Sequence, residues 1–189
     1  MTRTFMAGTL IVLFTALSCS YSDEAEVATA AQESAWLAEG AAIVAPYKLE
    51  LKAALMASLA DGPAEAIDVC RLQAPRISQD LAVNGIQIGR TSHRLRNPDN
   101  APRDWVRPLL ADYAQGNGEP QAQVTLLPGD RIGYVEPITV MAPCLLCHGS
   151  EIPSKAAQRI TELYPEDEAT GFAADDFRGL FWVEFPATP

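Results

Sequence analysis

Apolar residues in the first half of the chain recur at helical spacing. The Ala-rich stretch from about Ser34 to Leu59 predicts a long helix, and Asp61-Gly62 is a typical helix end. Pro63 suits the first turn of a second helix, which Asn84-Gly85 would end. Apolar residues follow at steps of three and four along this second helix: Ile67, Cys70, Ala74, Ile77 and Leu81. The side chain of Cys70 is therefore expected to point toward the interior.

Shorter alternating patterns in the second half of the chain predict strands. Strands are expected at residues 86–89, 123–127, 132–140 and 179–185, and helices at residues 104–113 and 152–164. Pro128-Gly129-Asp130 joins the second and third of these strands and is typical of a hairpin turn. Helices packed on a small antiparallel sheet define an α+β fold, which we predict for this chain.

The N-terminal segment has the pattern of an export signal. Arg3 precedes an apolar run from Met6 to Leu17, which is shorter than the roughly 20 residues that a membrane span needs. Small residues follow, so residues 1–18 predict a signal peptide and an exported, periplasmic protein. Cys19 lies where a bacterial lipoprotein carries its lipid, although Ala16 occupies the usual Leu position. We favour a lipid anchor at Cys19, with cleavage by ordinary signal peptidase as the alternative.

The rest of the chain predicts a short tether and one domain. Residues 19–33 are rich in Ser, Asp, Glu, Ala and Thr without apolar periodicity, and residues 34–189 contain all the predicted strands. A chain of 189 residues is long enough for one sizeable core. The Ala-rich first helix could also form a homodimer contact, although such helices more often pack within their own chain. No segment after the signal is apolar enough to span a membrane.

Composition and charge exclude some classes of partner. Hydrophobic residues make up 48% and charged residues 20% of the chain, which is typical of a globular protein. The formal net charge of −10 argues against nucleic acid or an anionic membrane surface as partner. Basic residues cluster between Arg90 and Arg107, but they match no nucleic-acid-reading motif.

The segment Cys144-Leu145-Leu146-Cys147-His148 has the C-x-x-C-H spacing of covalent haem attachment. In that chemistry two thiols add to the haem vinyl groups and the next His binds the iron. A redox dithiol or half of a zinc site is the alternative. Zinc would need two further ligands, for which His93 and Cys70 remain, and no βαβ pattern supports a thioredoxin-like dithiol. We predict one haem c, attached at Cys144 and Cys147, with His148 as iron ligand.

The second axial ligand of the iron is left open by the motif alone. The candidates are His93, Met141, Met56, Cys70 and water. Met141 lies too close to His148 in sequence to reach the opposite face of a macrocycle, and His93 lies in a polar, Arg-rich loop. Cys70 has no disulfide partner once the other cysteines are assigned, yet a buried free Cys is usually only a small hydrophobic residue.

Several further motifs occur in one order along the chain. They are Ala66–Cys70 with Ala74-Pro75, Ile88–Ser92, Leu95–Trp105, Cys144–Gly149, Tyr164-Pro165, Ala169–Gly171 and Arg178-Gly179. Through them the chain resembles, from about Trp36 to Phe185, a bacterial family of exported single-haem c-type proteins long described as a domain of unknown function. Members occur as stand-alone cytochromes and as sensor modules of chemoreceptors and histidine kinases. Val106 departs from the pattern, where Glu is expected.

The resemblance implies a fold and a ligand set. It implies a PAS-like central antiparallel sheet flanked by helices, and axial ligation by His148 and Cys70. A thiolate stabilises ferric iron, so a low reduction potential is expected. Arg90, Arg94 and Arg96 suit the binding of haem propionates, because Arg forms bidentate pairs with carboxylates. A solvated basic loop is the equally weighted alternative.

Three functions are consistent with such a site. A low-potential electron carrier needs two strong protein ligands, whereas a redox or small-ligand sensor needs a displaceable one. A haem enzyme such as a peroxidase would need a distal His with an acid partner, and the sequence shows none, so no enzymatic activity is expected. A sensor would act through a separate protein, since no kinase or receptor output region follows. We therefore favour the carrier, whose redox partner the sequence does not identify.

Overall fold

The computed structural model describes residues 20–117 and 121–187, with side chains from Thr29 onward, so the predicted signal peptide and Cys19 lie outside the described residues. The helices are α1 (Ser20–Leu59), α2 (Pro63–Asp68), α3 (Ala74–Leu81), α4 (Val106–Ala114), α5 (Leu145–His148) and α6 (Ser154–Leu163). A π-helical turn, η1 (Val69–Gln73), joins α2 to α3, and two 3-10 turns are η2 (Pro98–Asn100) and η3 (Ala142–Cys144). The strands are β1 (Gln87–Thr91), β2 (Gln123–Leu127), β3 (Arg131–Thr139) and β4 (Phe177–Phe185).

The four strands form one antiparallel sheet in the order β1-β4-β3-β2. The β2–β3 hairpin turns at Gly129 and Asp130, whose φ angles of 74° and 55° suit the residue types that tolerate the left-handed region. The last strand, β4, lies in the middle and pairs with both β1 and β3. The predicted α+β fold, with its antiparallel sheet and long N-terminal helix, is confirmed.

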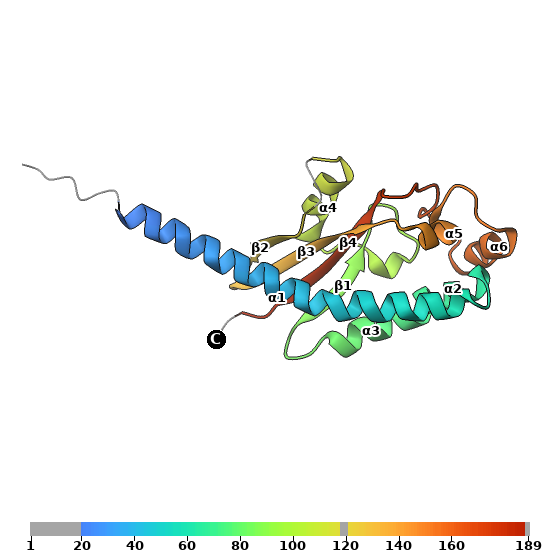
Figure 1. Ribbon diagram of the computed structural model, residues 1–189, viewed down its shortest axis with the longest axis horizontal. Helices are drawn as coiled ribbons and strands as arrows, with labels where there is room; N and C mark the ends of the chain where they lie inside the picture. The colour runs from blue at the N-terminus through green and yellow to red at the C-terminus, as the bar shows by residue number, and fades with distance from the viewer. Residues whose placement is uncertain (1–19, 118–120, 188–189) are drawn as a thin grey trace, which may run out of the picture.

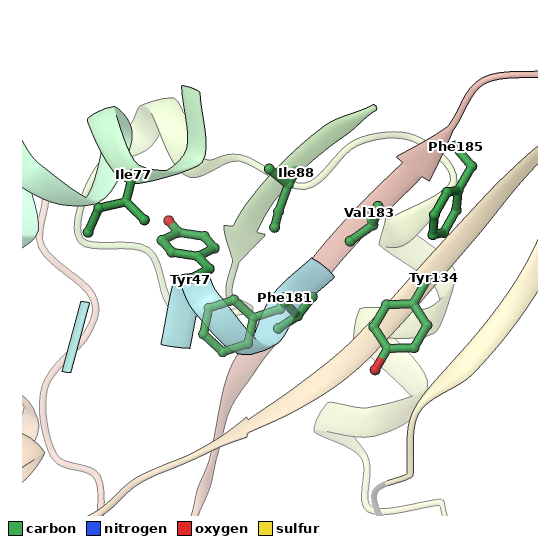
Figure 2. Packing of buried hydrophobic residues seen from close by; sticks show 8 residues of the cluster. Tyr47, Ile77, Ile88, Tyr134, Phe181, Val183 and Phe185 are labelled. Atoms are coloured by element: carbon green, nitrogen blue, oxygen red, sulfur yellow. The ribbon is translucent and has the colours of Figure 1, made fainter. Parts of the chain in front are cut away.

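Helices cover both faces of the sheet. Alternate residues of β4 point to opposite sides, as a strand requires. Phe181 packs with α1 and α3 on one face, in a cluster shown in Figure 2, whereas Leu180 packs with α4 on the other. In Figure 1, α5 and α6 gather beside α2 at one end of the molecule, and the first turns of α1 extend beyond the opposite end. The chain therefore builds three layers with a separate group of short helices at one end.

The helix α1 is longer than the sequence pattern predicted. It begins at Ser20 rather than near Ser34, so it includes residues 20–33, which were expected to form a tether. This stretch lacks Gly and Pro and is rich in Ala and Glu, so its helix propensity is high even without an apolar stripe. Farther along, α1 approaches the sheet closely at Gly40, where an added Cβ would lie 2.3 Å from the ring of Tyr134. No helix among the described residues is long and apolar enough to cross a membrane.

The second predicted helix contains a π-helical turn that the sequence pattern did not predict. The helical path from Pro63 to Leu81 is continuous, but η1 (Val69–Gln73) interrupts its α-helical geometry. Pro75 explains the interruption, because a proline inside a helix lacks an N–H and its ring clashes with the carbonyl four residues earlier. A wider π turn relieves that clash. Cys70 lies within this turn.

A buried carboxylate fastens the loop before α4 to the sheet. Glu184 is 3% exposed and binds Arg103 at 3.0 Å and Arg131 at 2.8 Å. The indole N–H of Trp105 donates to the same carboxylate at 2.7 Å. Trp105 also covers Gly133, where a Cβ would lie 2.8 Å from the indole ring. One acidic side chain therefore binds three side chains from two separate segments.

Replacing this carboxylate is expected to destabilise the fold. Glu184→Ala should lower the free energy of unfolding by about 3 kcal/mol. This value is at the lower end of the range for a broken buried ion pair, because both arginines are partly exposed and can be solvated once Glu184 is removed. Asp104→Ala is the matched control, since Asp104 pairs with Arg107 in full solvent and should matter little. Urea unfolding followed by circular dichroism measures both. Equal stability of the two variants would contradict the role given to Glu184.

Candidate functional site

The C-x-x-C-H segment forms two short helical turns directly after the sheet. At the end of β3 the backbone N–H of Val140 donates to Asp176 at 2.9 Å, which ties the segment to the start of β4. The turns η3 and α5 follow, and Cys144 N–H donates to Met141 at 2.8 Å. Cys144 and Cys147 are three residues apart on this helical path, so their side chains lie on one side of it. Both are free thiols and partly buried.

The imidazole of His148 is held at one nitrogen. Its Nδ1 lies 2.7 Å from the carbonyl oxygen of Ala169, which can only accept, so Nδ1 carries the proton and Nε2 keeps its lone pair. The ring meets Phe172 edge-on, with centroids 6.4 Å apart. Burial lowers the pKa of His148 well below its usual range, and the nearby charges of Arg178 and Arg96 lower it further. The imidazole is therefore neutral and oriented at neutral pH.

A buried ion pair lies behind His148. Arg96 and Asp167 meet at 3.0 Å, with side chains only 10% and 8% exposed. The Arg96 guanidinium also donates to the carbonyl oxygens of Cys147 at 2.7 Å and Ala169 at 3.2 Å. Asp167 accepts the backbone N–H of Ala169 at 2.9 Å. The pair therefore fixes both the C-x-x-C-H turn and the carbonyl that orients the imidazole.

Cys70 lies within electrostatic range of this segment. Burial raises the pKa of the Cys147 thiol; the charge of Arg96 lowers it, while the thiols of Cys70 and Cys144 raise it. The thiol of Cys147 donates to the carbonyl of Pro63 at 3.8 Å, so the start of α2 also touches the motif. The three cysteines therefore come from two distant parts of the chain and lie in one region.

Three further arginines surround the same region. Arg90 donates to the carbonyl oxygen of Cys70 at 3.3 Å, and Arg94 donates to that of Glu168 at 3.0 Å. The guanidiniums of Arg94 and Arg178 lie over the ring of Phe172, at 4.3 and 5.2 Å from its centroid. Arg90 and Arg96 therefore both lie beside cysteines, and Arg96 already has a carboxylate partner.

The other ligand candidates occupy different surroundings. The exposed ring of His93 stacks on Phe177, with centroids 5.5 Å apart. Partial burial lowers its pKa, and the charges of Arg178 and Arg94 add to that effect. Met141 and Met56 are each about half exposed, at 49% and 48%. Within the described residues, no group of three or more His, Cys, Asp or Glu side chains is arranged to hold a metal ion.

Several residues of this region escaped the sequence analysis. Asp167, Phe172 and Arg178 all contact the C-x-x-C-H segment or its supports. Arg178 belongs to the Arg178-Gly179 motif, through which the chain resembles the family, so the sequence did contain a signal that pointed to this residue. The role of the Ala169 carbonyl in orienting His148 could not be predicted from the sequence, because every residue has a backbone carbonyl.

Comparison with known proteins defines the family. The Tll0287-like family model matches residues 20–186, so this chain belongs to the Tll0287-like family. The chain also matches the crystal structure of the cyanobacterial heme-protein Tll0287, with 31% sequence identity and a TM-score of 0.54. That match covers 64% of this chain and 73% of the other. The comparison with curated proteins found no match to this chain.

Proposed function

We propose that this protein binds one haem covalently through Cys144 and Cys147, with His148 and Cys70 on the iron, and carries electrons at low potential. One observation carries the proposal: two free thiols on one helical path directly precede a neutral imidazole that is already held by its Nδ1. Membership of the Tll0287-like family supports it, since the solved relative is a heme-protein. The resemblance to single-haem c-type proteins supports the covalent form.

The side chains present fit this cofactor chemically. The carbonyl of Ala169 orients His148 and leaves Nε2 as the ligating atom, which is the usual arrangement of a metal-binding imidazole. Each thiol of Cys144 and Cys147 would add to one vinyl group, forming a C–S bond while its hydrogen passes to the neighbouring carbon. This addition needs no oxidant. Haem, when bound, supplies an iron that gains and loses one electron.

Cys70 supports the carrier over the sensor. The helix α2, which leads directly into its π-helical turn, touches Cys147 through the carbonyl of Pro63, and Arg90 donates to the backbone carbonyl of Cys70. Two strong protein ligands leave no open position for a gas or a substrate. A thiolate favours the ferric state and so lowers the potential. We therefore propose a carrier without enzymatic activity, and keep a periplasmic redox or small-ligand sensor with a separate partner as the alternative.

The proposed setting is the periplasm of a bacterium. It rests on the signal-like pattern of residues 1–18, and a lipid at Cys19 would tether the protein to a membrane. The redox partner would be another protein, and the net charge of −10 argues against nucleic acid as a partner.

Haem content and carbon monoxide binding test the proposal. The mature protein, made in a host that attaches haem c, should contain one haem per chain that stays bound on a denaturing gel. The reduced protein should keep its absorption spectrum under carbon monoxide. Absence of covalent haem would refute the cofactor assignment. Rapid carbon monoxide uptake would instead favour the sensor.

A further inference from the structure

Arg178 is held in place by hydrogen bonds that involve only one of the three nitrogens of its guanidinium. Its Nη1 donates to the hydroxyl of Ser92 and, at 3.2 Å, to the carbonyl oxygen of Arg94. The Ser92 hydroxyl in turn donates to the Arg178 carbonyl oxygen at 2.7 Å. Gly179, with φ of 155°, lets the backbone of Thr91 come so close that a Cβ would lie 2.1 Å from its carbonyl oxygen. Backbone and side chain of Arg178 are therefore both fixed.

The other two nitrogens of this guanidinium have no hydrogen-bond partner among the described residues. Nε and Nη2 make no hydrogen bond to any described residue, and neither is sealed in the core as an unsatisfied donor. No described carboxylate forms an ion pair with Arg178. One edge of a mostly buried guanidinium thus remains free for a ligand that can accept hydrogen bonds.

The charges around Arg178 are unbalanced. Arg90, Arg94, Arg96 and Arg178 lie in one region, and among the described residues only Asp167 forms an ion pair there, with Arg96. Burial lowers the pKa of Arg178 to about 10, and the charges of Arg90 and Arg96 contribute. This excess of positive charge occurs in a chain whose net charge is −10. An anion bound here would stabilise the cluster.

Arg178 also lies close to the imidazole of His148. One aromatic ring, that of Phe172, lies against both: the Arg178 guanidinium lies over it, 5.2 Å from its centroid, and the His148 ring stands at 85° to it, with the two centroids 6.4 Å apart. A ligand on His148 that carries carboxylates at its rim would therefore bring them within reach of this arginine.

We infer that Arg178 binds one carboxylate of the haem through the free edge of its guanidinium, a role for which the sequence offered Arg90, Arg94 and Arg96 as candidates. This inference rests on the proposed haem binding. A planar guanidinium suits a carboxylate because it offers parallel N–H groups. Arg96 serves instead as the positioning residue that holds the C-x-x-C-H turn, since its donors already meet Asp167 and two carbonyls.

Resonance Raman spectra of the haem-loaded protein test this assignment, because the haem carboxylate bands report hydrogen bonding. Arg178→Met should move one carboxylate band to the position of a water-exposed carboxylate and lower the midpoint of thermal unfolding. Arg178→Lys, which keeps the charge but loses the planar fork, should move it partway. Arg96→Met should leave that band in place while also lowering the unfolding midpoint. Arg107→Met, at an exposed arginine, is the control for charge and should change neither.

The outcomes separate this inference from the proposed function. Wild-type protein without haem would refute both. Haem-loaded Arg178→Met with unmoved carboxylate bands would refute the role of Arg178 alone, as would Arg96→Met that moves the same band. If Arg178→Met does not accumulate, Arg178→Lys decides: an unmoved band then refutes the inference, and a partial shift supports it.

Discussion

The double variant Cys144→Ser/Cys147→Ser should contain no haem that survives denaturation, against one per chain in the wild type. Both thiols are free and lie three residues apart on one helical path, so they are placed to form two thioether bonds to one macrocycle. Serine keeps the size of each side chain but cannot form those bonds. A denaturing gel with haem staining measures the loss, and acid extraction shows how much haem remains by ligation alone.

Two further variants give this experiment its control. Leu146→Ser changes the exposed residue between the two cysteines and should leave attachment intact. A single Cys147→Ser variant should keep one thioether bond and therefore one unsaturated vinyl group, which moves the α band of the pyridine haemochrome. Covalent haem in the double variant would mean that the attachment lies elsewhere in the chain.

Cys70→Ala should raise the reduction potential and change the low-spin ferric spectrum. As the proposed iron ligand, Cys70 would supply an anionic thiolate, so removing it would destabilise the ferric state more than the ferrous state. Axial ligands set haem potentials over a range of about 0.8 V, and an increase on the order of 100 mV is expected here. Potentiometric titration gives the shift, and electron paramagnetic resonance gives the change of ligand set.

A neighbouring residue supplies the control for Cys70. Leu72 lies in the same π-helical turn with its side chain 49% exposed, so Leu72→Ala perturbs the turn locally without touching a proposed ligand. Its spectrum should match that of the wild type. An unchanged spectrum in Cys70→Ala would falsify the ligation and return the choice to His93, Met141, Met56 or water.

The fold was largely predictable because its elements follow simple periodic patterns. The hairpin at Pro128-Gly129-Asp130 and the aromatic strand β4 lie where the sequence indicated, since alternation and turn residues are local signals. The start of α1 was misplaced because its acidic and Ala-rich first turns resemble a tether in composition. Strand order was not predictable, because pairing β4 with both β1 and β3 depends on contacts between distant residues.

From the sequence, the site could be predicted only where its chemistry depends on the types of the side chains. The C-x-x-C-H segment and Cys70 are candidates on residue type alone, and Cys70 lies within electrostatic range of Cys147. The hydrogen bond from His148 to Ala169 involves a backbone oxygen and could not be inferred. The sequence could not distinguish the roles of Arg96 and Arg178 either. Only the tertiary structure shows that Asp167 forms an ion pair with Arg96.

Because η1 (Val69–Gln73) is a π-helical turn, the direction of the Cys70 side chain depends on the number of residues in this segment as well as on their types. A π turn accommodates one residue more than the α-helix around it. Deleting one residue there would restore a regular helix and leave α2 and α3 nearly in their present orientation, because the wider turn already absorbs the extra residue, but the residues inside the turn would take new directions. The thiol of Cys70 would then leave its present direction although no residue type had changed. A relative with this cysteine but without the extra residue would present its thiol to a different neighbour.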